Sequence, residues 1–390
     1  MTDPAHLGGG HGDTLTRLRK SQEIPTVGRM DTPIDRVRSL LGARGMTQAE
    51  LGEAIGLDPS KMSKSLGGQR RFSSVEFAQI AERTGVTVDW LLTGAVDEIA
   101  LAARAESGTN AADAARLAHE VVELAQVAAD LGRAPRLVHL PPVDLESGTW
   151  QEQGARLADA ALAAPGAFGI AANGDLAGAI ERVYGIDVGV LDIEGEVDGL
   201  CAMQGEIAVI LAATTPLAAR QRFTLAHELG HALAGDDQGL RIDVNVYNSG
   251  RNGTEMRANA FAAAFLMPAD VIRQRVEDRA PTRELVAELA LDLAVSPSAL
   301  AARMESLGLV DGMAAGRLSD MTHKQAQQLT GRSSEWVEHT AASTRPRPPA
   351  DLANALYAAY VEGKTTLRPY ARLVGADVEE LRDSLETTGS

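Results

Sequence analysis

The stretch RFTLAHELGHAL, from Arg222 to Leu233, decides how the whole chain is interpreted. Its two histidines, His227 and His231, stand four positions apart, so on a helix their side chains project from one face, one turn apart. Two imidazoles in this arrangement can hold one zinc ion, and Glu228 between them can then polarise a bound water. The motif therefore predicts a zinc-dependent hydrolytic centre on a helix.

The flanks of the motif favour this interpretation over a chance match. The dipeptide His119-Glu120 shows how easily the first half of the pattern arises without a second histidine. Around the motif, however, the helix carries no further charge: its neighbours are Thr224, Leu225, Ala226, Leu229, Gly230, Ala232 and Leu233. Two histidines and a carboxylate buried on such a helix would cost free energy without a ligand.

A zinc site needs a third protein ligand. No histidine follows the motif until His323, so a third ligand close by in the sequence has to be a carboxylate. The next helical pattern, GTEMRANAFAAAFLMP, places Glu255 and Asn259 one turn apart. We predict that Glu255 binds the metal and that Asn259 orients a ligand through a hydrogen bond. The competing candidates are the aspartates of the intervening segment: Asp236, Asp237 and Asp243.

The segments around the motif offer two weaker hypotheses. The apolar stretch EIAVILAA, ahead of the motif, predicts a strand over residues 207–212. If this strand lies at a sheet edge it could align an extended substrate by backbone pairing, and if it is interior it has no such role. Tyr247 lies between the two ligand helices and is a candidate oxyanion stabiliser, with packing as the alternative.

Three segments in this order, RFTLAHELGHAL, EMRANAFAAAFLMP and LAVSPSALAARMESLGLV, resemble the ImmA/IrrE family of zinc metallopeptidases over residues 176–309. The resemblance implies a zincin-like fold in which His227, His231 and Glu255 bind zinc and Glu228 is the general base. It also implies protein substrates, such as repressors in stress responses or mobile elements. Some members use a histidine as third ligand, and this chain has none there.

A second pattern lies near the N-terminus, where Thr47 to Leu66 reads TQAELGEAIGLDPSKMSKSL. Thr47 with Glu50 forms a helix-start signature, and Pro59 marks the start of a second helix after a glycine turn. The chain carries a net charge of −16, yet bases outnumber acids between residues 14 and 72. This basic module is a candidate for binding phosphate.

In a helix-turn-helix the second helix lies in the major groove of DNA, and short polar or basic side chains on its exposed face read the duplex. The alternative is a solvated polar face on a small helical bundle. Residues 34–94 also resemble the phage-repressor-like (XRE) helix-turn-helix family. The loop GGQRRFSS is more basic than in many members of that family, which favours contacts of Arg70 and Arg71 with the DNA backbone. The predicted DNA-binding residues are Gln48, Ser60, Lys61, Ser63, Lys64, Arg70 and Arg71.

The predicted fold class is mainly α with a small antiparallel β-sheet. We expect a disordered arm over 1–30, a five-helix DNA-binding bundle over 31–95 and a helical connector over 96–150. A zincin-like metallopeptidase domain follows over 151–312, then a linker over 313–349 with the Pro-rich end STRPRPPA, and a C-terminal helical unit over 350–390.

Composition excludes other classes of protein. No apolar run is long enough to cross a bilayer, and the Gly-rich N-terminus lacks the apolar core of a secretory signal. With a single cysteine, Cys201, the chain forms no internal disulfide, so we expect a cytoplasmic protein.

The expected partners are double-stranded DNA and a protein substrate, which could be a helix-turn-helix repressor. Because both domains are in one chain, the protein could also cleave itself. A homodimer would suit a pseudo-palindromic operator. One rival is a transcription factor whose zincin fold is catalytically silent and serves in sensing or dimerisation. Another is a peptidase whose front domain binds a protein instead of DNA.

Overall fold

The computed structural model describes residues 32–44, 46–84, 88–93, 109–134, 136–172, 174–193, 197–236, 239–244, 253–276 and 281–388. The chain divides into two compact units, residues 1–107 and 108–390. The arm predicted over residues 1–30 lies outside the described ranges.

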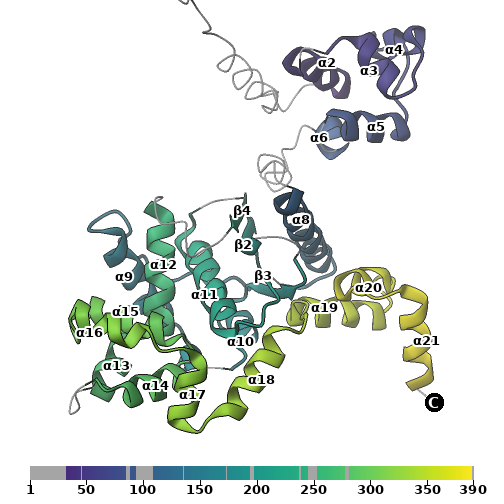
Figure 1. Cartoon of the computed structure of the whole chain (residues 1–390). Coiled ribbons are helices and arrows are strands. Elements are labelled where there is room, and N and C mark those ends of the chain that lie inside the picture. The colour runs from purple at the N-terminus through teal and green to yellow at the C-terminus, as the bar shows by residue number, and fades with distance from the viewer. Residues whose placement is uncertain are drawn as a thin grey trace, which may run out of the picture. The chain divides into compact units, whose positions relative to one another are not determined.

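The first unit contains the five predicted helices (Figure 1): α2 (Pro33–Arg44), α3 (Gln48–Ala54), α4 (Pro59–Leu66), α5 (Ser74–Thr84) and α6 (Val88–Thr93). Thr47 and Glu50 cap α3 reciprocally, and Asp58 caps α4 ahead of Pro59, as the sequence predicts. Between these helices Gly56 takes a left-handed conformation with φ 66°, which makes the tight turn. The buried core is apolar: Val37, Leu40, Leu51, Ile55, Met62, Leu66, Phe72, Ile80 and Leu91.

The second unit is predominantly helical around one small sheet, which agrees with the predicted fold class. Its elements before the motif helix are α8 (Thr109–Asp130), α9 (Trp150–Leu162), the 3-10 turn η1 (Ile170–Ala172), α10 (Leu176–Tyr184), β1 (Asp187–Leu191), β2 (Val197–Gln204) and β3 (Ile207–Ala213). From the motif onward they are α11 (Ala218–Ala234), β4 (Gly239–Val244), α12 (Gly253–Leu266), α13 (Ala269–Val276), α14 (Arg283–Asp292) and α15 (Pro297–Ser306).

The sheet has the strand order β1-β3-β2-β4. β2 pairs antiparallel with both β3 and β4, but β1 pairs parallel with β3. The sheet is therefore mixed, not purely antiparallel as predicted. β3 lies inside the sheet, so the hypothesis that this strand offers its edge to a substrate is wrong. The strands at the two edges of the sheet are β1 and β4, and β4 was not predicted from the sequence.

Successive side chains of β2 point to opposite faces of the sheet, and both faces are covered. Cys201 and Met203 belong to the core shared with α11, whereas Leu200 and Ala202, also buried, point the other way. α8 packs against β2, β3 and β4, and Figure 1 shows the sheet between α8 and α11. The prediction of a connector over 96–150 is therefore wrong for α8, which forms a layer of the second unit.

The prediction of a linker over residues 313–349 is also wrong. Three helices occupy most of it: α16 (Gly312–Ser319), α17 (His323–Thr330) and α18 (Ser333–Ser343). At its Pro-rich end Arg347 exchanges backbone hydrogen bonds with Val190 of β1, at 2.8 and 2.7 Å. The C-terminal helices are α19 (Ala350–Val361), α20 (Arg368–Val374) and α21 (Val378–Thr388), and α19 packs on α8 and β1.

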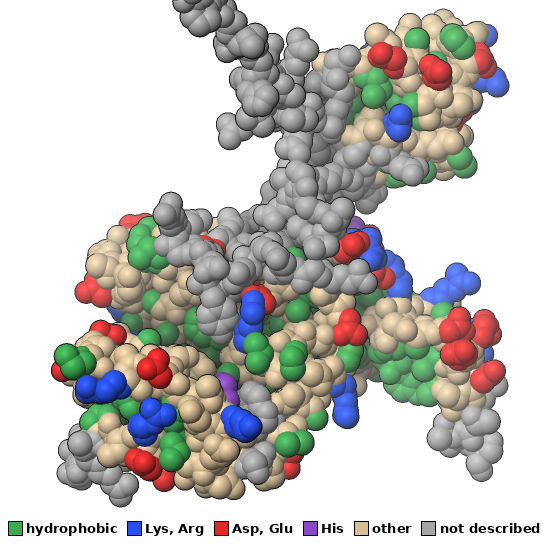
Figure 2. Space-filling view, viewed as in Figure 1, with side chains coloured by type: hydrophobic (Ala, Val, Ile, Leu, Met, Phe, Trp, Pro, Cys, Tyr) green, Lys and Arg blue, Asp and Glu red, His purple; other side chains and the backbone are tan. Residues whose placement is uncertain are grey.

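Among the helices that the structure describes, none alone has the length and apolar composition to cross a membrane. α14 and α15 meet that test only as a pair, and a bend of 105° separates them. Acidic side chains gather over α21, at the right of Figure 2, where Glu379 and Glu380 occupy its first turn.

Candidate functional site

The motif helix α11 packs closely on α12 because of a glycine inside the motif. A Cβ at Gly230 would lie 2.9 Å from the ring of Phe261 on α12, closer than two carbon atoms can approach. At the other end of α11, Gln221 donates hydrogen bonds to the carbonyls of Ala213 (3.0 Å) and Ser343 (2.9 Å). The helix that carries the histidines is thus held at both ends by buried contacts.

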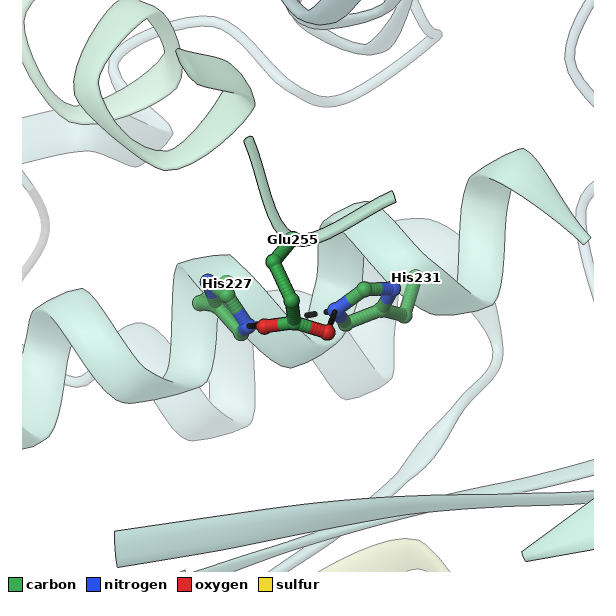
Figure 3. Close-up of side chains that lie close together, drawn as sticks. All are labelled: His227, His231 and Glu255. Carbon is green, nitrogen blue, oxygen red and sulfur yellow. Dashed lines mark hydrogen bonds and ion pairs between the residues drawn. The ribbon is translucent and has the colours of Figure 1, made fainter. Parts of the chain in front are cut away.

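The two histidines and Glu255 converge at the contact between α11 and α12 (Figure 3). The Nε2 atoms of His227 and His231 lie 3.1 Å apart. Glu255 Oε2 lies 3.3 Å from Nε2 of His227, and Glu255 Oε1 lies 3.4 Å from Nε2 of His231. All three side chains are buried. The structure therefore brings together the three residues that the sequence selected as metal ligands.

These distances fit a tetrahedral zinc site. Ligand atoms about 2.0–2.1 Å from a tetrahedral zinc lie about 3.4 Å from one another. The two Nε2 atoms are 3.1 Å apart, and each has an oxygen of Glu255 near that distance, Oε2 at 3.3 Å from His227 and Oε1 at 3.4 Å from His231. Two nitrogen donors and one carboxylate are also a donor set typical of catalytic zinc.

Each imidazole is held through its other nitrogen. Nδ1 of His227 lies 3.1 Å from Oδ1 of Asn259, the partner that the sequence predicted. Nδ1 of His231 lies 2.9 Å from Oδ2 of Asp236. If each Nδ1 carries the proton and donates it, each Nε2 keeps its lone pair for a metal. Asp236 is thus a partner of His231 on the side away from the cluster, not the third member of the cluster.

The charges of this buried region also fit a divalent cation. The carboxylates of Glu228, Glu255 and Asp236 are all buried, and Arg257 forms an ion pair with Asp236. A cation held between the histidines and Glu255 would be attracted by these buried carboxylates, because charges of opposite sign attract strongly at a buried site.

Glu228 faces the sheet. A Cβ at Gly199 of β2 would lie 3.1 Å from Oε1 of Glu228 and 2.4 Å from Cγ2 of Thr224. Only glycine lets β2 approach α11 this closely, because the methyl group of Thr224 and the carboxylate of Glu228 fill the space that a side chain would take. No pattern in the sequence indicates this role of Gly199.

Arg222, the first residue of the motif stretch, is also buried on α11. Burial lowers its pKa to about 10, so the guanidinium keeps its charge at neutral pH. It borders a cavity of about 530 Å³ between α11, α18 and the start of α10.

Other candidates from the sequence are not tested by this geometry. Asp237 and Tyr247 lie outside the described residues. Asp243 lies on β4 opposite Gly199, and its side chain is not described.

In the first unit, α4 presents the predicted polar face. Ser60, Lys61, Ser63 and Lys64 are exposed, while Met62, Ser65 and Leu66 of the same helix are buried. Gln48, at the start of α3, and Arg71 are exposed as well. These six residues are therefore accessible to a partner.

Arg70 differs from the other predicted DNA-binding residues. Its guanidinium forms two hydrogen bonds with the carboxylate of Glu76, at 3.0 and 2.7 Å, and one with Oγ of Ser65 at 2.8 Å. Arg70 thus ties the loop to α4 and α5. Its guanidinium is engaged inside the unit, which a prediction based on charge alone could not foresee.

Comparison with known proteins supports the second unit's chemistry. Residues 182–305 match the peptidase family described as the IrrE N-terminal-like domain. The radiation response metalloprotease IrrE of Deinococcus radiodurans is 40% identical over 119 residues, which are 30% of this chain and 35% of the relative. Its counterpart from Deinococcus deserti is 40% identical over 99 residues, 25% of this chain and 34% of the relative.

The chain thus spans about a third of the length of these curated relatives. The match includes α11 and α12 and with them the whole histidine and glutamate cluster. Residues 182–305 are therefore similar to the IrrE N-terminal-like domain of a peptidase family.

Proposed function

We propose that this chain is a DNA-binding regulator whose second unit is a zinc-dependent endopeptidase. The observation that carries the proposal is the buried cluster of His227, His231 and Glu255, whose donor atoms lie at the separations of a tetrahedral zinc site. The similarity of the surrounding segment to metalloproteases supports the same chemistry.

Zinc held by these three residues would supply the Lewis acidity that polarises a peptide carbonyl and acidifies water. Glu228, next to His227 and buried against Gly199, is the group we assign as general base. It would accept the proton of the attacking water and return it to the leaving amine. Asn259 and Asp236 would hold the imidazoles so that each Nε2 faces the metal.

The test of peptidase activity uses the full chain loaded with zinc and a mixed peptide library read by mass spectrometry. We expect cleavage by the unchanged protein, and no cleavage by Glu228→Gln, which should still bind one zinc per chain. If His231→Ala keeps the zinc, the site is misassigned. If the unchanged protein binds zinc but cuts nothing, the second unit is a silent module for sensing or dimerisation.

The first unit is proposed to bind duplex DNA through α4. Four exposed polar residues, among them Lys61 and Lys64, lie on one face of this helix, with its apolar residues in the core behind them. Lys61 is already 3.4 Å from Asp58, an exposed pair that is worth little and can open toward a phosphate. The resemblance to repressor-like helix-turn-helix domains points the same way.

Salt dependence of binding to a mixed-sequence duplex tests this proposal. Replacing both Lys61 and Lys64 by Ala should weaken binding and reduce the slope of log affinity against log salt by about 2, one for each lost phosphate contact. Arg83→Ala, an exposed cation in the last turn of α5, is the matched control. If the lysine variant and the control bind equally, α4 does not contact DNA.

The substrate of the peptidase is proposed to be a protein, with a helix-turn-helix repressor as the first candidate. Because both units share one chain, cleavage in cis is a further route to release DNA. A homodimer would match a pseudo-palindromic operator.

A further inference from the structure

The imidazole of His231 is held by a carboxylate that reaches it through a chain reversal. Gly235 ends α11 in a left-handed conformation with φ 64°, and Asp236 follows it. This turn brings Oδ2 of Asp236 to 2.9 Å from Nδ1 of His231, with both side chains almost fully buried. Nδ1 of the other histidine, His227, lies 3.1 Å from Oδ1 of the neutral amide of Asn259, so the Nδ1 atoms of the two imidazoles have different partners.

Asp236 is in turn compensated from a different helix. Its second oxygen, Oδ1, forms an ion pair with Arg257 of α12, two residues beyond Glu255. A buried carboxylate that lost this ion pair would no longer be held in one orientation, and if it turned away it would release His231.

Arg257 is fixed by α9. Its guanidinium lies 5.4 Å from the centre of the Trp150 indole, and its Nη1 is 3.4 Å from Oε1 of Gln153. A Cβ at Gly253 would lie 2.3 Å from the same indole, and one at Gly154 would lie 2.4 Å from the carbonyl oxygen of Arg257. The two glycines therefore let α9 and α12 come close enough for Trp150 and Gln153 to hold the guanidinium.

We propose that Asp236, Arg257 and Trp150 are positioning residues for His231, so that α9 governs how tightly the site binds its metal. An imidazole N–H donated to a carboxylate fixes the tautomer and makes the opposite nitrogen a stronger donor. Arg257 keeps that carboxylate in place through their ion pair, and the indole keeps Arg257 in place. This inference rests on the metal site of the proposed function.

The experiment measures zinc affinity of the full-length protein by competition with a chromogenic chelator. We expect Asp236→Asn and Arg257→Met each to weaken zinc binding about 10- to 100-fold, the usual effect of losing such a partner. Because the two groups act on one imidazole, the zinc affinity of the double variant should be little lower than that of the single variant that binds zinc more weakly. Arg257→Lys, which keeps the charge, should bind zinc more tightly than Arg257→Met. Trp150→Ala should lose less zinc affinity than Arg257→Met.

A matched control separates positioning from general destabilisation. Arg133 and Asp187 form another, partly buried pair, at 2.7 and 2.5 Å, on elements other than those that carry His227, His231 and Glu255. Arg133→Met should lower the melting temperature and leave zinc affinity unchanged. Asp236→Asn, which keeps the size of the side chain, serves if Arg257→Met does not fold.

The outcomes are distinguishable from those of the proposed function. If the unchanged protein binds no zinc, the proposed function itself fails. If it binds zinc, and Asp236→Asn and any folded Arg257 variant bind it as tightly, the positioning inference alone is overturned. Spectra of protein labelled with ¹⁵N-histidine add a second readout, since His231 should hold its proton on Nδ1 in the unchanged protein and become a tautomer mixture in metal-free Asp236→Asn.

Discussion

Gly230, the glycine of HELGH, belongs to the metal site although it carries no ligand. Phe261 fills the space where its side chain would be, so Gly230→Ala has to push α12 away and carry Glu255 with it. We expect weaker zinc binding together with a stability loss of about 1–3 kcal/mol, the usual cost of overpacking. Chelator competition and thermal melting check both. Gly316→Ala on α16 is the control, because nothing lies within 4 Å of its added methyl group.

Gly199 should give a different result from Gly230. An alanine there would meet Thr224 and Oε1 of Glu228, not the residues of the cluster. Gly199→Ala should therefore reduce peptide cleavage while leaving zinc affinity close to that of the unchanged protein. If zinc affinity fell as far as in Gly230→Ala, Glu228 and the metal ligands would not be separable in this way.

The residues that the sequence identified are those whose geometry is local. His227 and His231 share a helix face because of their spacing, and Glu255 and Asn259 do so on the next helix. Asp236 could be proposed only as a competitor, because its hydrogen bond depends on the turn at Gly235. Contacts between helices, such as that of Arg257 with Trp150, leave no periodic trace in the sequence.

Among the elements, α8 behaves as part of the second unit. Its buried residues, including Ala118 and Val122, help cover the sheet face that carries Leu200 and Ala202. A chain that begins at residue 108 should therefore fold and bind zinc. A chain that begins at residue 131 should expose that face and aggregate or melt non-cooperatively. Circular dichroism and size-exclusion chromatography distinguish the two, and equal behaviour would mean that α8 is dispensable.

Arg347 ties the Pro-rich segment to the fold in a pH-dependent way. It pairs with buried Glu181, whose pKa is raised by burial and lowered in part by this arginine. In Arg347→Met the pKa of Glu181 should rise further. Because the fold disfavours the ionised form of Glu181, the protein is less stable at a pH above the folded-state pKa. This loss of stability decreases as the pH falls below that pKa.

The loss of stability in Arg347→Met should therefore be greatest near neutral pH, about 3 kcal/mol, and should shrink on acidification. Urea unfolding across a pH series measures it. Arg382→Met removes an exposed pair with Glu379 on α21 and should cost less than about 0.5 kcal/mol at every pH. A loss that stayed constant with pH would show that Arg347 acts only through its other contacts.

The helices were predictable because capping residues and apolar spacing involve only residues close in the sequence, as at Thr47 and Asp58. The sheet was harder, since the parallel pairing of β1 with β3 joins strands separated by β2. β4 is a short strand with a charged Arg241 and Asp243, which do not give a strand signal. The prolines around Arg347 predict a linker, although its backbone forms hydrogen bonds with Val190 of β1.

For the whole molecule, two units imply two unfolding transitions. The residues proposed to bind zinc lie in the second unit, so free zinc at about 100 times the dissociation constant should stabilise that unit by about 2.7 kcal/mol and leave the first unchanged. Calorimetry with and without a chelator shows this. Leu51→Ala, a buried residue of α3, identifies the transition of the first unit. A shift of both transitions would mean that the units unfold together.

The first and last parts of the second unit lie against each other. Arg372 of α20 reaches back to Glu120 and Glu123 of α8, at 2.7 and 3.2 Å. Because α8 and α20 are in contact, a short peptide could join the two ends of the second unit. A circularly permuted protein, with a short peptide joining the C-terminal helices to α8 and new ends opened in a surface loop, should fold to the same arrangement. By the same reasoning, a DNA-binding unit could be attached at either end without disturbing the metal site.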